Sequence, residues 1–169
     1  MKSATLLLLL TVPAYAVGVH AAADVAFYAQ AAEAGVAEIE AGKLAQQRAS
    51  TPAIREFAAR MVTTHSTVHD ELKALARKRG LIVPATPAVA DAAKLQVIGT
   101  LPGERFDRAY IKGQVADHER MIALLQKEIA LGSDKDAQAF AEKLLPDVQG
   151  HLETARQIAG KLPQGDTEP

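Results

Sequence analysis

Three histidines replace apolar residues on the core-facing stripes of three amphipathic segments. Within each segment the apolar residues recur at steps of three and four, which is the spacing of one face of an α-helix. Neutral imidazole nitrogens are good ligands for transition-metal ions. If the three helices pack together, imidazoles at similar depth can bind one ion between them. The three residues are His65, His118 and His151.

A carboxylate occupies the comparable position in an earlier segment. Glu38 lies near the middle of a stripe of small residues that runs from Tyr28 to Ala45. At about 1.5 Å of rise per residue, Glu38 and the three histidines lie within roughly one helical turn of a common depth. The sequence therefore predicts a core metal site built from Glu38, His65, His118 and His151. Its ligands suit zinc, copper, iron or manganese.

The same residues also fit a structural role without a metal. His65 with Glu38, and His118 with His151, could form two hydrogen-bonded pairs inside the core. A wider site for two metals is a further alternative, because some polar residues lie four positions from a stripe histidine and share its helix face. These residues are His69, Gln114 and Asp147. His69 and Asp147 fall beside the stripes, which favours exposure to solvent.

The sequence shows no signature of an enzyme. Ferritins and di-iron oxygenases carry Glu-x-x-His on two helices, whereas here the residue three before each core histidine is a valine: Val62, Val115 and Val148. No Ser/His/Asp or Cys/His arrangement indicates nucleophilic catalysis. A single metal with an open coordination position would still allow redox or hydrolytic chemistry.

The elements that must position these side chains are four long helices. A long connection, residues 81–101, joins the second and third, and its segment "AVADAAKLQVI" predicts a short extra helix. Such a connection allows the second and third helices to run parallel, as in ferritin-like bundles with one crossover. We therefore predict an all-α, ferritin-like four-helix bundle. Its helices are expected over about 24–48, 52–79, 103–132 and 134–160.

The N-terminal residues predict export. Lys2 precedes a short apolar run, Leu6 to Val12, and small residues follow in the order of a signal-peptidase site. The run is too short to span a bilayer. We expect a signal peptide over residues 1–21, the bundle over 22–162 and a C-terminal tail over 163–169. The mature protein is then periplasmic or secreted, and the absence of cysteine excludes a lipoprotein anchor.

The amino-acid composition limits the classes of molecule that the protein is expected to bind. The chain has 19 basic and 20 acidic residues, and removal of Lys2 with the signal leaves 18 against 20. A net charge near zero gives no electrostatic attraction for nucleic acid or an anionic membrane. Without cysteine, stability must come from packing, or from packing plus a metal. The expected partners are a metal ion and, at the outer surface, a second copy of the chain or another envelope protein.

Three blocks resemble a bacterial family of exported domains of unknown function, family 4142, which is assigned to the ferritin-like superfamily. The resemblance covers residues 24–158, and the family's recurring histidines and first-helix glutamate match His65, His118, His151 and Glu38. One departure is Thr64, where the family commonly has an aspartate before the histidine. The blocks are "EAGVAEIEAGKLAQQRASTPAIREFAARMVTTHS", "FDRAYIKGQVADHERMIAL" and "FAEKLLPDVQGHLETA".

Two functional interpretations follow. The first is an exported ferritin-like bundle, related to stress or to the envelope, that binds a metal ion through its Glu/His cluster. The alternative is a structural or interaction module of the cell envelope whose core histidines serve only as hydrogen-bond partners.

Overall fold

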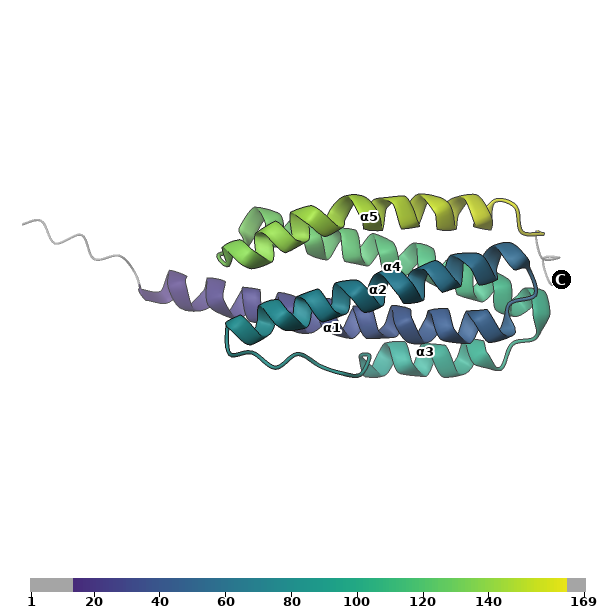
Figure 1. The fold of residues 1–169 in the computed structure, drawn as a ribbon, viewed down its shortest axis with the longest axis horizontal. Helices are drawn as coiled ribbons and strands as arrows, with labels where there is room; N and C mark the ends of the chain where they lie inside the picture. The colour runs from purple at the N-terminus through teal and green to yellow at the C-terminus, as the bar shows by residue number, and fades with distance from the viewer. Residues whose placement is uncertain (1–13, 164–169) are drawn as a thin grey trace, which may run out of the picture.

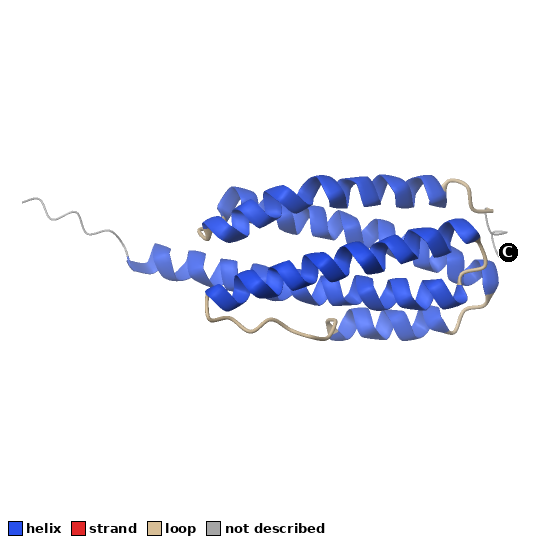
Figure 2. Cartoon of the chain, in the orientation of Figure 1, coloured by secondary structure: helices blue, strands red, loops and turns tan. Residues whose placement is uncertain are grey.

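The computed structural model of the chain describes residues 14–163, and the side chains of residues 22–163. Every regular element in this part of the chain is a helix (Figure 2). The predicted all-α class is therefore confirmed. The helices are α1 (Ala14–Arg48), α2 (Pro52–Lys78), α3 (Val89–Gly99), α4 (Gly103–Leu131) and α5 (Lys135–Ala159). The predicted tail, like the first thirteen residues of the predicted signal peptide, lies almost wholly outside the described residues.

The helix ends follow local sequence signals, with one difference from expectation. Pro52 occupies the first turn of α2, where its missing N–H is no loss, and Gly80 takes a positive φ just after that helix. Asp134 caps α5 by accepting hydrogen bonds from the N–H groups of Asp136 and Ala137. α1, however, begins at Ala14 and not near Asp24. The intervening residues are rich in alanine and contain no proline, so nothing stops the helix there.

The four long helices lie side by side, and α3 packs beside α1 (Figure 1). α1 and α2 form one antiparallel hairpin, and α4 and α5 form a second. The connection that contains α3 returns the chain along the length of the molecule, so α2 and α4 run in the same direction. This parallel arrangement is the one that the long connection allows, and α3 covers part of the seam between α1 and α4.

The core consists of two apolar clusters with a polar layer between them. One cluster contains Phe27, Leu72 and Phe140, and the other contains Phe57 and Phe106. Along each long helix, the residues of the two clusters are separated by one of the predicted site residues. The buried apolar side chains thus hold the helices together at both ends of the polar layer. The residues of this layer are Glu38, His65, His118 and His151.

Two buried aspartates fix the helices against one another along their axes. Asp107 of α4 accepts hydrogen bonds from the backbone N–H groups of Ser50, at 2.9 Å, and Thr51, at 3.2 Å, in the α1–α2 turn. Asp24 of α1 accepts one from the N–H of Ser133, at 2.9 Å, in the α4–α5 turn. Each hairpin therefore secures the turn of the other. Because these contacts set the axial register, they also bring the polar residues of different helices to one depth.

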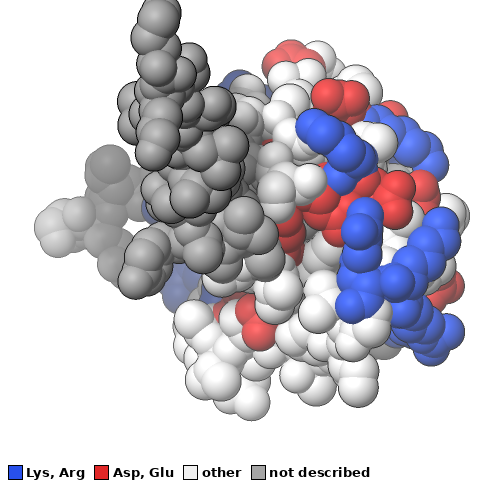
Figure 3. All heavy atoms as spheres, turned by 90° about the vertical axis from the view of Figure 1, so that its left-hand side faces the viewer, with Lys and Arg blue, Asp and Glu red and all other residues white. Residues whose placement is uncertain are grey.

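The surface carries mixed charges. Figure 3 views the end at which α2 ends and α5 begins, and basic and acidic side chains lie next to each other there. Arg79 pairs with Asp134 and Asp136 across this end, and Lys143 pairs with Glu71. Within the described residues, no helix is long and apolar enough to cross a bilayer.

Candidate metal centre

The three core histidines come from three helices and meet in the polar layer. Their ring centroids form a nearly equilateral triangle, with sides of 5.7 Å (His65–His118), 5.8 Å (His65–His151) and 5.6 Å (His118–His151). One nitrogen of each ring can be chosen so that the three lie within 4.8 Å of one another. Three ligand atoms therefore converge on one small volume between α2, α4 and α5.

Each of the three rings also has one nitrogen without a hydrogen-bond partner. Nε2 of His65, Nε2 of His118 and Nδ1 of His151 are all buried and have no partner among the described residues. A buried polar atom without a partner costs about 1–3 kcal/mol, so native proteins rarely leave one unexplained. One such atom on each of three adjoining rings does not fit the structural alternative, in which His118 and His151 are bonded to each other.

Burial keeps the imidazoles neutral at physiological pH. Loss of solvent, with smaller contributions from the other two rings, lowers the pKa of His65 to about 3. Loss of solvent likewise lowers the pKa of His118 to about 4, and it also lowers the pKa of the half-buried His151. The neutral imidazole is the form that carries a lone pair for a metal, so no proton has to be displaced near pH 7.

A chain of contacts behind His118 orients its ring. Nδ1 of His118 lies 2.9 Å from the carbonyl oxygen of Gln114, which can only accept, so Nδ1 carries the proton and Nε2 keeps the lone pair. The Gln114 side chain donates from Nε2 to Oε2 of Glu38 at 2.7 Å. The other Glu38 oxygen lies 4.0 Å from Nδ1 of His118. A contact of this kind, behind a ligating histidine, typically fixes both tautomer and ring orientation.

Glu38 thus lies beside His118 on its Nδ1 side, and it is not part of the group of converging nitrogens. Its side chain is buried, and loss of solvent raises its pKa to about 8, although the hydrogen bond from Gln114 acts in the opposite direction. Among the residues considered for a second metal, Asp147 is exposed and His69 is half-buried. Neither belongs to the converging group.

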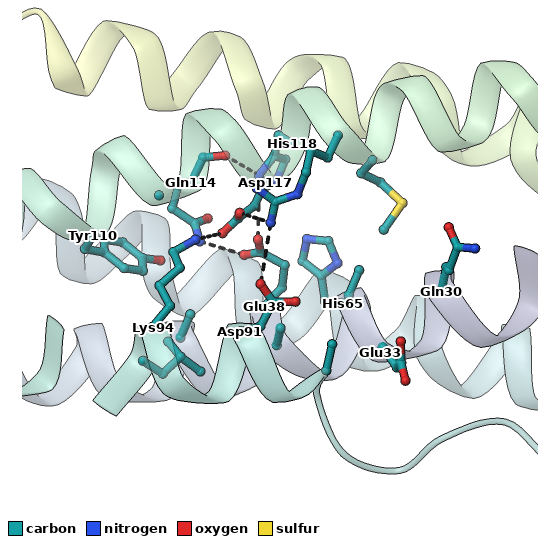
Figure 4. A pocket seen from close by; sticks show the side chains of 18 of the residues that line it. Gln30, Glu33, Glu38, His65, Asp91, Lys94, Tyr110, Gln114, Asp117 and His118 are labelled. Carbon is teal, nitrogen blue, oxygen red and sulfur yellow. Dashed lines mark hydrogen bonds and ion pairs between the residues drawn. The ribbon is translucent and has the colours of Figure 1, made fainter. Parts of the chain in front are cut away.

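A cavity of about 250 Å³ adjoins the histidine triangle (Figure 4). It lies between α1, α3 and α4, and His65 and His118 form part of its wall, whereas His151 does not. Ion pairs of Lys94 with Asp117 and of Arg120 with Asp91 lie at its edge. The cavity therefore extends from the polar layer to α3.

Two roles could not be read from the sequence. Gln114 was recognisable as a neighbour of His118 on the same helix face, but its contact with Glu38 spans two helices. Tyr110 reads as an ordinary aromatic core residue of α4. In the structure its hydroxyl is buried without a partner, and its side chain lines the cavity near Glu38 (Figure 4).

Comparisons with known proteins bear on the family and on the fold. The family model for the domain of unknown function DUF4142 matches residues 12–158. A DUF305 fragment from Deinococcus radiodurans has a similar structure, with a TM-score of 0.74 and 14% identity, over 83% of this chain and 97% of that one. A conserved hypothetical protein, rv2844, from Mycobacterium tuberculosis gives a TM-score of 0.63 at 18% identity, over 89% and 99%. At these identities the two structures support the helical fold alone. A search of curated proteins gives no match.

Proposed function

The chain belongs to the DUF4142 family, and we propose that it is a ferritin-like four-helix bundle that binds one transition-metal ion through His65, His118 and His151. The observation that carries this proposal is the convergence of three neutral imidazoles from three helices, each with a buried nitrogen that has no hydrogen-bond partner among the described residues. A metal ion supplies the missing partner of all three at once. Three histidines with one open position form a familiar ligand set for zinc, and imidazole also suits copper and iron.

The spacing of the nitrogens fits this ligand set. Metal–nitrogen bonds of about 2.1 Å require the three nitrogens to lie roughly 3.5 Å apart. The corners of a triangle with 4.8 Å sides lie about 2.8 Å from its centre, so each nitrogen must move inward by about 1 Å or less. Small side-chain rotations provide such a movement without a shift of the helices. The cavity beside His65 and His118 offers an entry path.

Glu38 has a different role in this proposal from the one that its stripe position predicts. Its carboxyl group supports His118 from the Nδ1 side, together with Gln114, while the ion binds on the opposite side of the ring. Loss of such a supporting group typically lowers metal affinity by about 10- to 100-fold, whereas loss of a ligand removes the site. Replacement of Glu38 should therefore weaken metal binding, whereas replacement of His118 should abolish it.

The cellular setting is part of the proposal. The apolar stretch after Lys2 and the small residues that follow it support export, with removal of residues 1–21. In a periplasmic or secreted protein without cysteine, an ion bound between three helices would reinforce the packed core. We propose a metal-binding protein of the envelope or of a stress response.

The test is metal binding by the purified chain. After chelation and dialysis, the protein is titrated with zinc, copper, iron(II) and manganese, and bound metal and melting temperature are measured. We expect one equivalent of at least one ion, and a rise in melting temperature, because a ligand that prefers the folded state stabilises it. His118→Gln should abolish both effects, and Glu38→Gln should only weaken them.

His69→Gln is the matched control, since His69 lies one turn from His65 and outside the converging group. It should bind metal as the unaltered chain does. If the folded chain binds none of the four ions stoichiometrically, or if His118→Gln binds as tightly as the unaltered chain, the three-histidine site is wrong.

A further inference from the structure

The half of the cavity that faces away from the histidine triangle forms a second polar site. Its floor consists of Glu38, Gln114 and Tyr110, which point toward one another in Figure 4. All three side chains are at least nine-tenths buried, with exposures of 6%, 1% and 1%. The walls are mainly apolar, and they include Ala37, Ala41, Leu95 and Ile98.

Oxygen atoms of the floor lack hydrogen-bond partners among the described residues. The side-chain amide of Gln114 donates from Nε2 to Oε2 of Glu38, while the side-chain oxygen Oε1 of Gln114 has no partner among the described residues. The Tyr110 hydroxyl also lacks a partner. The remaining Glu38 oxygen has only Nδ1 of His118 nearby, and that N–H is donated to the Gln114 backbone. Three oxygens from two helices are thus available to one donor-rich group.

The charges around the cavity also favour a cation. Lys94 pairs with Asp117, and Arg120 pairs with Asp91 and Asp117, so both basic residues of the lining are engaged. Within the described residues, no lysine or arginine lies within ion-pairing distance of Glu38. A positive group that enters the cavity would meet a buried carboxyl group that has no cationic partner, and its charge would favour the ionised form of that group.

We propose that this cavity binds a small organic molecule with a primary ammonium group and a short aliphatic chain. The ammonium group has three N–H donors and no acceptor, which matches the oxygens of Glu38, Gln114 and Tyr110. The aliphatic chain lies against the alanines of α1 and the apolar residues of α3. At about 250 Å³, the cavity is smaller than the pockets that take drug-sized ligands, so the molecule has only a few carbons.

The probes are n-butylammonium, n-butanol, butyrate and ammonium, and binding is measured by calorimetry and amide chemical shifts. The protein is the full chain, freed of metal and held near pH 7, so that a protonated amine cannot bind as a metal ligand. Butylammonium should bind saturably, and each of the other probes should bind at least tenfold more weakly. Butanol lacks the charge, butyrate reverses it and ammonium lacks the aliphatic chain.

Variants locate the site. Glu38→Gln should weaken butylammonium binding by at least about tenfold, since hydrogen bonds to charged groups are the stronger kind, and Tyr110→Phe by about three- to tenfold. Glu40→Gln is the matched control, because Glu40 lies on the exposed side of the same helix. Tyr110→Phe keeps the volume of the ring, so it tests the location of the butylammonium site even if Glu38→Gln does not fold.

The proposed ammonium site in the cavity and the proposed metal site can be tested independently of each other. His151→Gln removes a proposed metal ligand that does not line the cavity, so it should leave butylammonium binding unchanged. No saturable binding of butylammonium to the folded chain would overturn the proposal and leave the cavity to water. Equal binding of butanol or ammonium, or unchanged binding by Tyr110→Phe, would overturn it as well.

Discussion

Glu38→Gln should stabilise the metal-free protein near neutral pH, and this advantage should shrink in acid. Burial raises the pKa of Glu38 to about 8 from its usual 4.5. Between these two values the folded state holds a proton that the unfolded chain releases. The contribution of Glu38 to stability is therefore fully present below pH 4.5 and is lost as the pH rises toward and through 8. Glutamine does not titrate, so the variant escapes this loss.

The magnitude follows from the two pKa values. One pKa unit corresponds to about 1.36 kcal/mol. Ionisation of Glu38 in the unfolded chain therefore lowers the free energy of unfolding by about 4 kcal/mol at pH 7.5 and by about 1 kcal/mol at pH 5. The difference in unfolding free energy between Glu38→Gln and the unaltered chain should thus fall by about 3 kcal/mol between these pH values. Any pH-independent effect of the amide cancels in this comparison.

The buried histidines act with the opposite sign. Because the pKa values of His65 and His118 fall to about 3 and about 4, the folded state keeps them neutral where the unfolded chain takes up protons. Their contribution is present above the usual value of 6.5 and is lost as the pH falls below it. Between pH 7.5 and pH 5, each of these two histidines should lower the free energy of unfolding by about 2 kcal/mol. In the unaltered chain Glu38 offsets most of this loss, so Glu38→Gln should be the more acid-sensitive protein.

Urea unfolding followed by circular dichroism, with chelator present at pH 7.5 and pH 5, measures both quantities. Glu40→Gln is the control on the exposed side of α1, and its difference from the unaltered chain should be small at both pH values. A constant difference between Glu38→Gln and the unaltered chain would mean that Glu38 is ionised in the fold at pH 7.5. Burial would then not hold Glu38 in its neutral form within the polar layer.

Three further predictions test the framework. In Gly42→Ala, the added Cβ would lie 2.7 Å from Cγ2 of Val62 and 3.0 Å from the carbonyl oxygen of Ala58, so we expect the free energy of unfolding to fall by about 1–3 kcal/mol in thermal unfolding. In the control Gly150→Ala, the added Cβ meets nothing within 4 Å on an exposed part of its helix, so the free energy of unfolding should rise by about 0.5–1 kcal/mol. An equal loss of stability in both variants would contradict the close approach of α1 and α2. Asp107→Ala removes the acceptor of the Ser50 and Thr51 N–H groups and should cost about 3 kcal/mol in urea unfolding, whereas a change below about 0.5 kcal/mol would show that this contact does not secure the turn. N-terminal sequencing of the exported protein should begin between Val17 and Asp24, and a retained Met1 would refute the predicted signal peptide.

Local sequence signals predict most of the helix bounds and the faces that the helices bury. Local rules act within a few residues, so proline at a helix start, aspartate at a cap and glycine after a helix end give the bounds of α2, α4 and α5 closely. The apolar stripes likewise place His65 and His118 in the core, because burial of a helix face depends on its own periodicity. The early start of α1 escaped these rules, since an alanine-rich stretch carries no signal at which a helix must begin.

Which polar residues meet depends on how the helices pack against one another. The stripes give each side chain a face and an approximate depth, but the rotation and axial shift of one helix against another depend on contacts such as those of Asp24 and Asp107 with the opposite turns. A shift of one residue moves a side chain by about 1.5 Å along the axis and 100° around it. That sensitivity is why spacing alone predicts Glu38 in one group with the three histidines, whereas the packed helices bring the three histidines together and place Glu38 on the Nδ1 side of His118.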